Sequence, residues 1–155
     1  MGGDQMTRPE ERRDRRHRRD GLDSHRAGQV VPAAAVRAGG WSELMRLEPG
    51  SGVPLHRHSG EVHAYCLTGS REILGTDDIA GPGSYVYEPG GTIDAWQAIG
   101  DQPCVLHLKI AGAIDYLDSD GQVFDTVDAT TQRRAYLDWC AEHGTEPDER
   151  ILGGS

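Results

Sequence analysis

The sequence is short of apolar residues and has no long apolar run. Hydrophobic residues make up 36% of the 155 residues, with a single phenylalanine, whereas about 45–50% is usual in globular domains. No run approaches the roughly 18–20 apolar residues that span a bilayer, and the N-terminus lacks the apolar core of a signal peptide. We therefore expect a cytoplasmic protein with no membrane partner.

Cysteine is also scarce. Cys66, Cys104 and Cys140 lie far apart in the chain and form no C-x-x-C pair. This spacing fits neither a disulfide scaffold nor a zinc cluster, and it favours reduced, buried thiols.

Basic residues are few outside the N-terminus. The net charge is −9, and half of the 16 lysines and arginines lie before residue 27. The rest of the chain is therefore acidic and repels nucleic acids, so we expect no nucleic-acid partner. Residues 1–28 are rich in arginine and poor in apolar residues, which predicts a disordered tail. A tail that binds a phosphate-rich or acidic partner is the alternative.

From Val30 onward, short apolar stretches alternate with turns that contain glycine or proline. The stretches are residues 41–49, 63–69, 70–75, 83–91 and 103–110. Within them, apolar and polar residues alternate, and the scheme repeats about every 10 residues, as is typical of an all-β sandwich or barrel.

The C-terminal part of the chain has a different pattern. Ser119–Gly121 predicts a hairpin turn. Apolar residues at near-helical spacing then predict a helix, with Asp128 as its N-cap and Gly144 as its stop. We expect one folded domain over residues 29–144, followed by a flexible tail over residues 145–155.

Two histidines carry the first sign of a metal site. His56 and His58 are two residues apart on a predicted strand, so both imidazoles leave the same face and can converge on one ion. Glu61 and His63 follow across a turn and could add a ligand or support one. Because a pair of ligands needs further donors, exposed histidines on a surface strand are the alternative.

These segments resemble the two motifs of the cupin superfamily, G-x5-H-x-H-x(3,4)-E-x6-G and G-x5-P-x-G-x2-H-x3-N. The matching residues are Gly50, His56, His58 and Gly69 in the first motif, and Gly83, Pro89 and Gly91 in the second. The resemblance implies an all-β cupin fold, a double-stranded β-helix or jelly-roll barrel, here with one C-terminal helix. Cupins often pair through edge strands, so we expect a homodimer.

Within the superfamily, the chain looks most like the 2,4′-dihydroxyacetophenone dioxygenase and acetylacetone dioxygenase group. That resemblance implies ferrous iron held by three histidines, with His56 and His58 in the first two places and Glu88 as a supporting glutamate. Asp94 stands where the third histidine belongs.

This departure from the motif leaves three interpretations open. If Asp94 binds, the site has two histidines and one carboxylate, a set associated with non-haem Fe(II). If Asp94 turns away, His63 or His107 could replace it, and imidazole also suits zinc or nickel. If the metal is lost, Asp94 beside the histidines could serve as a general base.

The resemblance implies a metal-dependent dioxygenase that acts on a ketone, an enol or an aromatic, polyketide-like small molecule. The expected metal ligands are His56, His58 and Asp94; the expected catalytic residues are Glu88, His63 and Tyr65; the expected substrate contacts are Tyr87, Trp96, His107 and Lys109, the last for an anionic group. Fe(II) is the expected divalent metal. The alternatives are a non-redox isomerase, cyclase, dehydratase or decarboxylase, and a non-catalytic sensor of a metal or ligand.

Overall fold

The computed structural model describes residues 35–153, and the tail predicted for residues 1–28 lies outside them. These residues form two antiparallel sheets and one helix. The five-stranded sheet has the order β1 (Ala35–Arg37), β2 (Gly40–Leu47), β9 (Cys104–Ala111), β4 (Val62–Thr68) and β7 (Tyr85–Glu88). The six-stranded sheet has the order β11 (Val123–Val127), β10 (Ile114–Leu117), β3 (Gly52–His58), β8 (Ile93–Ile99), β5 (Ser70–Ile73) and β6 (Ile79–Ala80).

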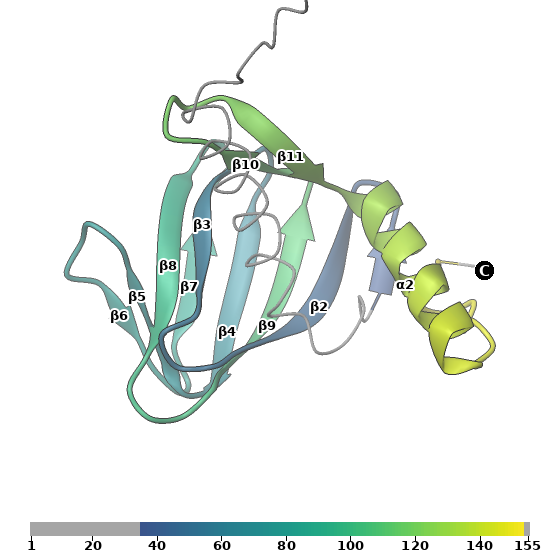
Figure 1. The fold of residues 1–155 in the computed structure, drawn as a ribbon, viewed down its shortest axis with the longest axis horizontal. Helices are drawn as coiled ribbons and strands as arrows, with labels where there is room; N and C mark the ends of the chain where they lie inside the picture. The colour runs from purple at the N-terminus through teal and green to yellow at the C-terminus, as the bar shows by residue number, and fades with distance from the viewer. Residues whose placement is uncertain (1–34, 154–155) are drawn as a thin grey trace, which may run out of the picture.

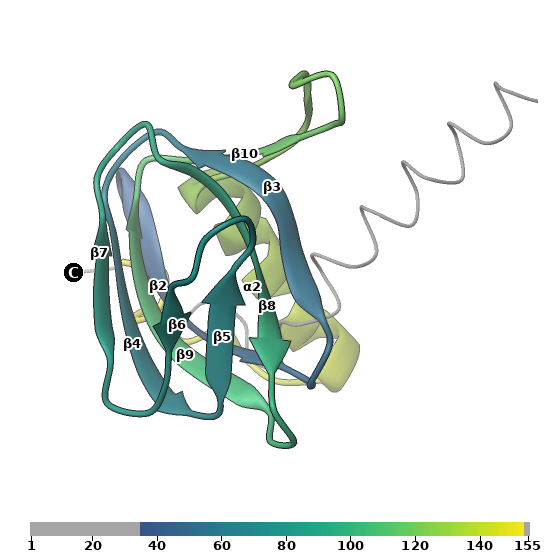
Figure 2. The ribbon, with the colours of Figure 1, turned by 90° about the vertical axis from the view of Figure 1, so that its left-hand side faces the viewer.

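The two sheets face each other as the walls of a barrel (Figures 1 and 2). Strands far apart in the sequence are neighbours, as β3 and β8 are in the six-stranded sheet. The predicted all-β fold with one C-terminal helix is confirmed. None of the helices in the described part of the chain is long and apolar enough to cross a membrane.

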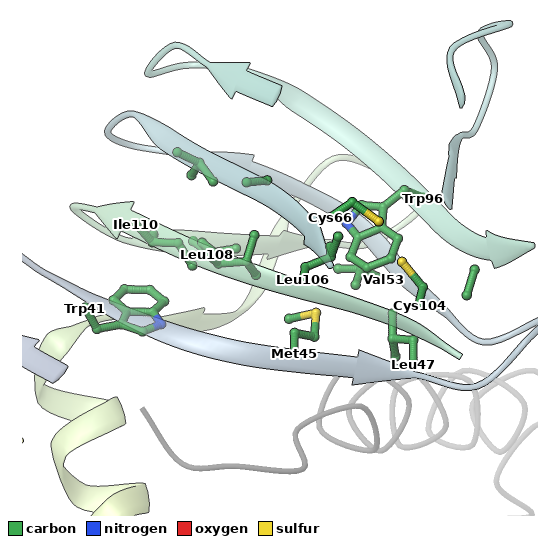
Figure 3. Close-up of a cluster of buried hydrophobic side chains, with 14 of the residues drawn as sticks. Trp41, Met45, Leu47, Val53, Cys66, Trp96, Cys104, Leu106, Leu108 and Ile110 are labelled. Carbon is green, nitrogen blue, oxygen red and sulfur yellow. The ribbon is translucent and has the colours of Figure 1, made fainter. Parts of the chain in front are cut away.

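The core lies between the sheets and follows from the alternation along the strands. On β4, Val62, Ala64 and Cys66 are buried and point inward, because successive residues of a strand face opposite sides of the sheet. On β9, Leu106 and Leu108 do the same. Figure 3 shows part of this core, which also includes residues of β2, β3 and β8.

Helix α2 (Ala129–His143) begins and ends at the predicted caps. The Asp128 side chain accepts a hydrogen bond from the Thr131 backbone N–H at 2.9 Å, and the Thr131 hydroxyl accepts one from the Asp128 N–H at 2.8 Å. Gly144 has a left-handed conformation with φ 63°, which a glycine adopts without steric cost. The turn at residues 119–121 also joins two antiparallel strands as predicted.

Of the tail predicted for residues 145–155, residues 145–153 are described, and the last of them contact the domain. The Val36 N–H donates to the Ile151 carbonyl at 2.7 Å. Leu152 is 8% exposed and packs with Tyr136 and Cys140 of α2. These contacts remove apolar surface from water, which stabilises this conformation of the C-terminal residues.

The three cysteines are free and buried, as predicted. Burial raises the pKa of Cys104 to about 12. The thiol is therefore protonated at neutral pH and unreactive.

Candidate metal centre

Both histidines of the H-x-H pair point into the barrel from β3. His56 and His58 are each 3% exposed, and the residue between them, Arg57, faces outward. The pairing of β3 with β8 shifts register between Val53 and His56, so a bulge allows both of these residues to face inward. The imidazole rings of the pair lie with their centroids 4.7 Å apart at 81°.

Two carboxylates reach the histidines from the two ends of one loop. Glu88 is the last residue of β7 in the five-stranded sheet, and Asp94 pairs with His56 from β8 in the other sheet. The connecting loop turns at Gly91, which has φ 90° and donates its N–H to the His58 carbonyl at 2.7 Å. The loop thus fixes both carboxylates relative to β3.

The donor atoms of His56, His58 and Asp94 all lie within 4.8 Å of one another. Asp94 Oδ1 is 3.0 Å from His56 Nε2 and 3.8 Å from His58 Nε2. Glu88 Oε2 is 3.1 Å from His58 Nε2. His56 Nδ1 lies 2.8 Å from the Pro54 carbonyl, a contact that places the ring proton on Nδ1 and leaves Nε2 free as a ligand.

The electrostatics of the cluster favour a positive charge at its centre. Burial by itself lowers the pKa of His58, but the carboxylates of Asp94 and Glu88 outweigh it and raise that pKa to about 9. Burial by itself raises the pKa of Asp94, but His56 and His58 outweigh it and hold that pKa well below the ordinary value. A field that stabilises a proton here also stabilises a metal cation.

The residues present fit a divalent metal ion. Asp94 Oδ1 and both ring nitrogens of His58 are buried, and none of their contacts within residues 35–153, the ion pairs above included, has the geometry of a hydrogen bond. Buried polar atoms without partners are costly, and a shared cation would satisfy them. Two imidazoles and one carboxylate are a ligand set that suits Fe(II) and leaves coordination positions for other ligands.

A cavity of about 420 Å³ adjoins the cluster, a size within the range of small-molecule sites. Trp96, a predicted substrate contact, lines it together with His56, His58 and Glu88. Most of the remaining wall is apolar, and helix α2 contributes residues at one side. The apolar and partly apolar lining residues are Trp41, Met45, Val53, Ala64, Leu108, Ile110, Ile114, Tyr116, Val127 and Ala135.

Sequence reasoning missed two polar features of this cavity. Arg71 of β5 is 2% exposed and lines the cavity, with Nη2 3.5 Å from Glu88 Oε1. Glu43 and Gln132 also line it, and Glu43 Oε2 accepts from Trp41 Nε1 at 3.1 Å. The signal for Arg71 was its place in the strand, since residues two apart share a face and Arg71 lies on the same face as Ile73.

Five predicted site residues lie on outward-facing positions of the strands and do not line the cavity. These residues are His63, Tyr65, Tyr87, His107 and Lys109. Tyr65 and Tyr87, for example, are 43% and 52% exposed. The reason is strand alternation, because their neighbours in the chain are the inward-facing residues.

His63 and His107 therefore do not replace Asp94 as a ligand. His63 makes contacts on the outer face instead, where its Nδ1 meets the Tyr85 hydroxyl and its Nε2 lies 3.3 Å from Glu61 Oε1. Asp94 points toward the histidines, so the interpretation in which it turns away is also wrong.

Similar folds occur among solved structures. An RmlC-like cupin protein from Ralstonia eutropha JMP134 is 28% identical with a TM-score of 0.70, over 75% of each chain. A protein of unknown function with a cupin-like fold from the same organism is 25% identical with a TM-score of 0.64, over 68% of this chain and 67% of that one. The acetylacetone dioxygenase from Acinetobacter johnsonii is 19% identical with a TM-score of 0.60, over 64% and 69%, a likeness of fold alone.

The predicted membership of the cupin superfamily is confirmed. No curated protein sequence matches the chain. The family model of the ChrR cupin-like domain, Cupin_7, matches residues 28–112. Because this match covers more than half of the 155 residues, the chain belongs to the family of ChrR cupin-like domains.

Proposed function

We propose that the chain is a metal-dependent cupin enzyme, a non-haem Fe(II) dioxygenase that cleaves a small ketone or enol. The observation that carries this proposal is the group of His56, His58 and Asp94, whose donor atoms lie within 4.8 Å of one another beside a cavity of about 420 Å³. The 2-His-1-carboxylate set is associated with Fe(II) oxygenases. The similar fold of a known dioxygenase is compatible with this reaction.

The three residues would hold the ion. When bound, ferrous ion supplies the Lewis-acid and oxygen chemistry that side chains lack. The protein's own contribution begins with Glu88, which lies beside His58 and lines the cavity. Its carboxylate can accept the proton from the carbon next to a ketone, and the electron pair of that C–H bond passes to the carbonyl oxygen as an enolate.

The cavity wall orients the substrate and keeps water away. Trp96 and Tyr116 are 4% and 5% exposed and line the cavity with aromatic surface. Burial also raises the pKa of Tyr116, so its hydroxyl stays protonated and adds no negative charge to the cavity wall. An apolar wall with few polar groups is the usual form of a small-molecule site.

The test is oxygen uptake by the iron-loaded chain with a series of β-diketones and hydroxyacetophenones. We expect oxygen and substrate to disappear together. Glu88→Gln should lower kcat by about 10²–10⁴-fold, the usual contribution of a general base. Lys109→Met is the control, because Lys109 is on the outer face, and it should leave the rate unchanged.

Other outcomes would favour the alternatives. Substrate loss without oxygen uptake would favour the non-redox isomerase, cyclase, dehydratase or decarboxylase, since a bound metal can polarise a carbonyl without oxygen. Bound metal and bound ligand without turnover of any substrate in the series would favour a sensor.

A further inference from the structure

Arg71 is a buried cation, and part of its hydrogen-bonding capacity is not used by the described residues. Its side chain is 2% exposed, and its Nε and Nη2 atoms have no hydrogen-bond partner within residues 35–153. The guanidinium lies 4.9 Å from the centroid of the Trp96 ring. Burying an arginine without full pairing costs free energy. An anionic partner that binds Arg71 would lower this cost.

Glu88 does not fill this role alone. Its Oε1 is 3.5 Å from Arg71 Nη2, and the contact is not a directed hydrogen bond. Its other oxygen lies 3.1 Å from His58 Nε2. One carboxylate is therefore shared between the guanidinium and the candidate metal ligands, and donors of Arg71 stay unused.

The charges around the candidate metal centre are closely balanced. Asp94, Glu88 and the buried Glu43 are acidic, and Arg71 and a divalent ion would together offset them, because neutral imidazoles add no charge. An anionic ligand is therefore favoured locally, by the unused donors of Arg71 on the cavity wall.

We infer that Arg71 binds a carboxylate of the substrate, so that the substrates are oxo acids, which carry a carboxylate as well as a ketone or enol. This inference rests on the proposed function and names its substrate class. A guanidinium presents paired N–H donors that match the two oxygens of a carboxylate. Arg71 thus takes the role that sequence reasoning gave to Lys109, which lies on the outer face.

The test compares one ligand with and without its charge. The probes are 2,4-dioxopentanoate and its methyl ester, which share a β-diketone and differ in the carboxylate. Binding to the full chain is measured by calorimetry without oxygen, both with the metal as purified and after chelation. In wild type we expect the acid to bind about 10- to 100-fold more tightly than the ester, the range for charge-assisted hydrogen bonds.

Three substitutions assign this preference to Arg71. Arg71→Gln should abolish it, while Arg57→Gln, the matched control, should keep it because Arg57 faces outward and pairs with Asp115 at 2.9 Å. Arg71→Lys should keep part of it, since an ammonium lacks the paired donors. The preference should persist after chelation, which separates Arg71 from a metal that binds the carboxylate itself.

Equal affinities for acid and ester in wild type would overturn the inference, whether or not Arg71→Gln folds. A preference that survives in Arg71→Gln would also overturn it. Failure of the proposed function is a separate result, because oxygen uptake could be absent while the preference for the acid remains.

Discussion

Asp94 is the carboxylate in the candidate set of metal ligands. Its Oδ1 is 3.0 Å from His56 Nε2, and the two residues are paired across β3 and β8. A carboxylate at this place neutralises one charge of a divalent ion, which a third imidazole would not do. Asp94 would therefore affect both the affinity for the metal and the net charge that a bound substrate meets.

Substitution of Asp94 tests its role as a ligand. Asp94→Ala should weaken metal binding by more than about 10-fold, because even residues that only support a ligand contribute that much. Asp94→His should retain binding, since it restores a third imidazole. Affinity is measured by competition with a chromogenic chelator. Asp115→Ala, a change on the surface, is the control, and an unchanged affinity of Asp94→Ala would remove Asp94 from the site.

Residues of the candidate metal centre could be predicted from sequence where they lie close together in the chain. The spacing of His56 and His58 puts them on one face of any strand. The inward orientation of Arg71 follows from its place on the strand, but its approach to Glu88 could not be predicted, because that contact depends on the closure of two sheets. The phase of β4 was misjudged, since small residues such as Ala64 fill the inside while the larger aromatic residue Tyr65 lies outside.

The loop between β7 and β8 is the element that assembles the site. It joins the two sheets over residues 89–92 and carries Glu88 before it and Asp94 after it. Its backbone is held to β3, since the His58 N–H donates to the Thr92 carbonyl at 2.9 Å and Gly91 donates to His58. A change in this loop should therefore alter stability and metal binding together.

Gly91→Ala tests this coupling. Gly91 has φ 90°, and an added Cβ would meet nothing within 4 Å, so the cost is conformational, about 1–2 kcal/mol. Chemical denaturation should show this loss, and metal affinity should fall as the loop shifts. Gly121→Ala is the matched control, with φ 76° and no atom within 4 Å. It should lose similar stability without losing metal, and equal metal binding by the two variants would contradict the role of the loop.

Most elements could be predicted because glycine, proline and caps mark their ends. The predicted stretches at 41–49 and 103–110 correspond to β2 and β9, and the caps of α2 lie where they were expected. The bulge in β3 was not predicted. It depends on the pairing of β3 with β8, which joins segments far apart in the sequence.

Residues 35–153 form a barrel whose mainly apolar interior holds a cluster of charged and polar groups. His56, His58, Glu88 and Arg71 are all buried. Apolar residues of similar size would often be neutral or stabilising at such positions, so stability does not account for the cluster. We attribute the cluster to a function that needs these charged and polar groups. The homodimer expected from the sequence stays a prediction.

Metal analysis of the full chain, purified without added metal, tests the central claim most directly. We predict about one iron ion per chain, and its loss in the His56→Ala/His58→Ala variant, which circular dichroism should show to be folded. Zinc or nickel in place of iron would keep the centre and favour the non-redox alternative. A wild-type chain that contains no metal and binds none of the three on titration would contradict the account.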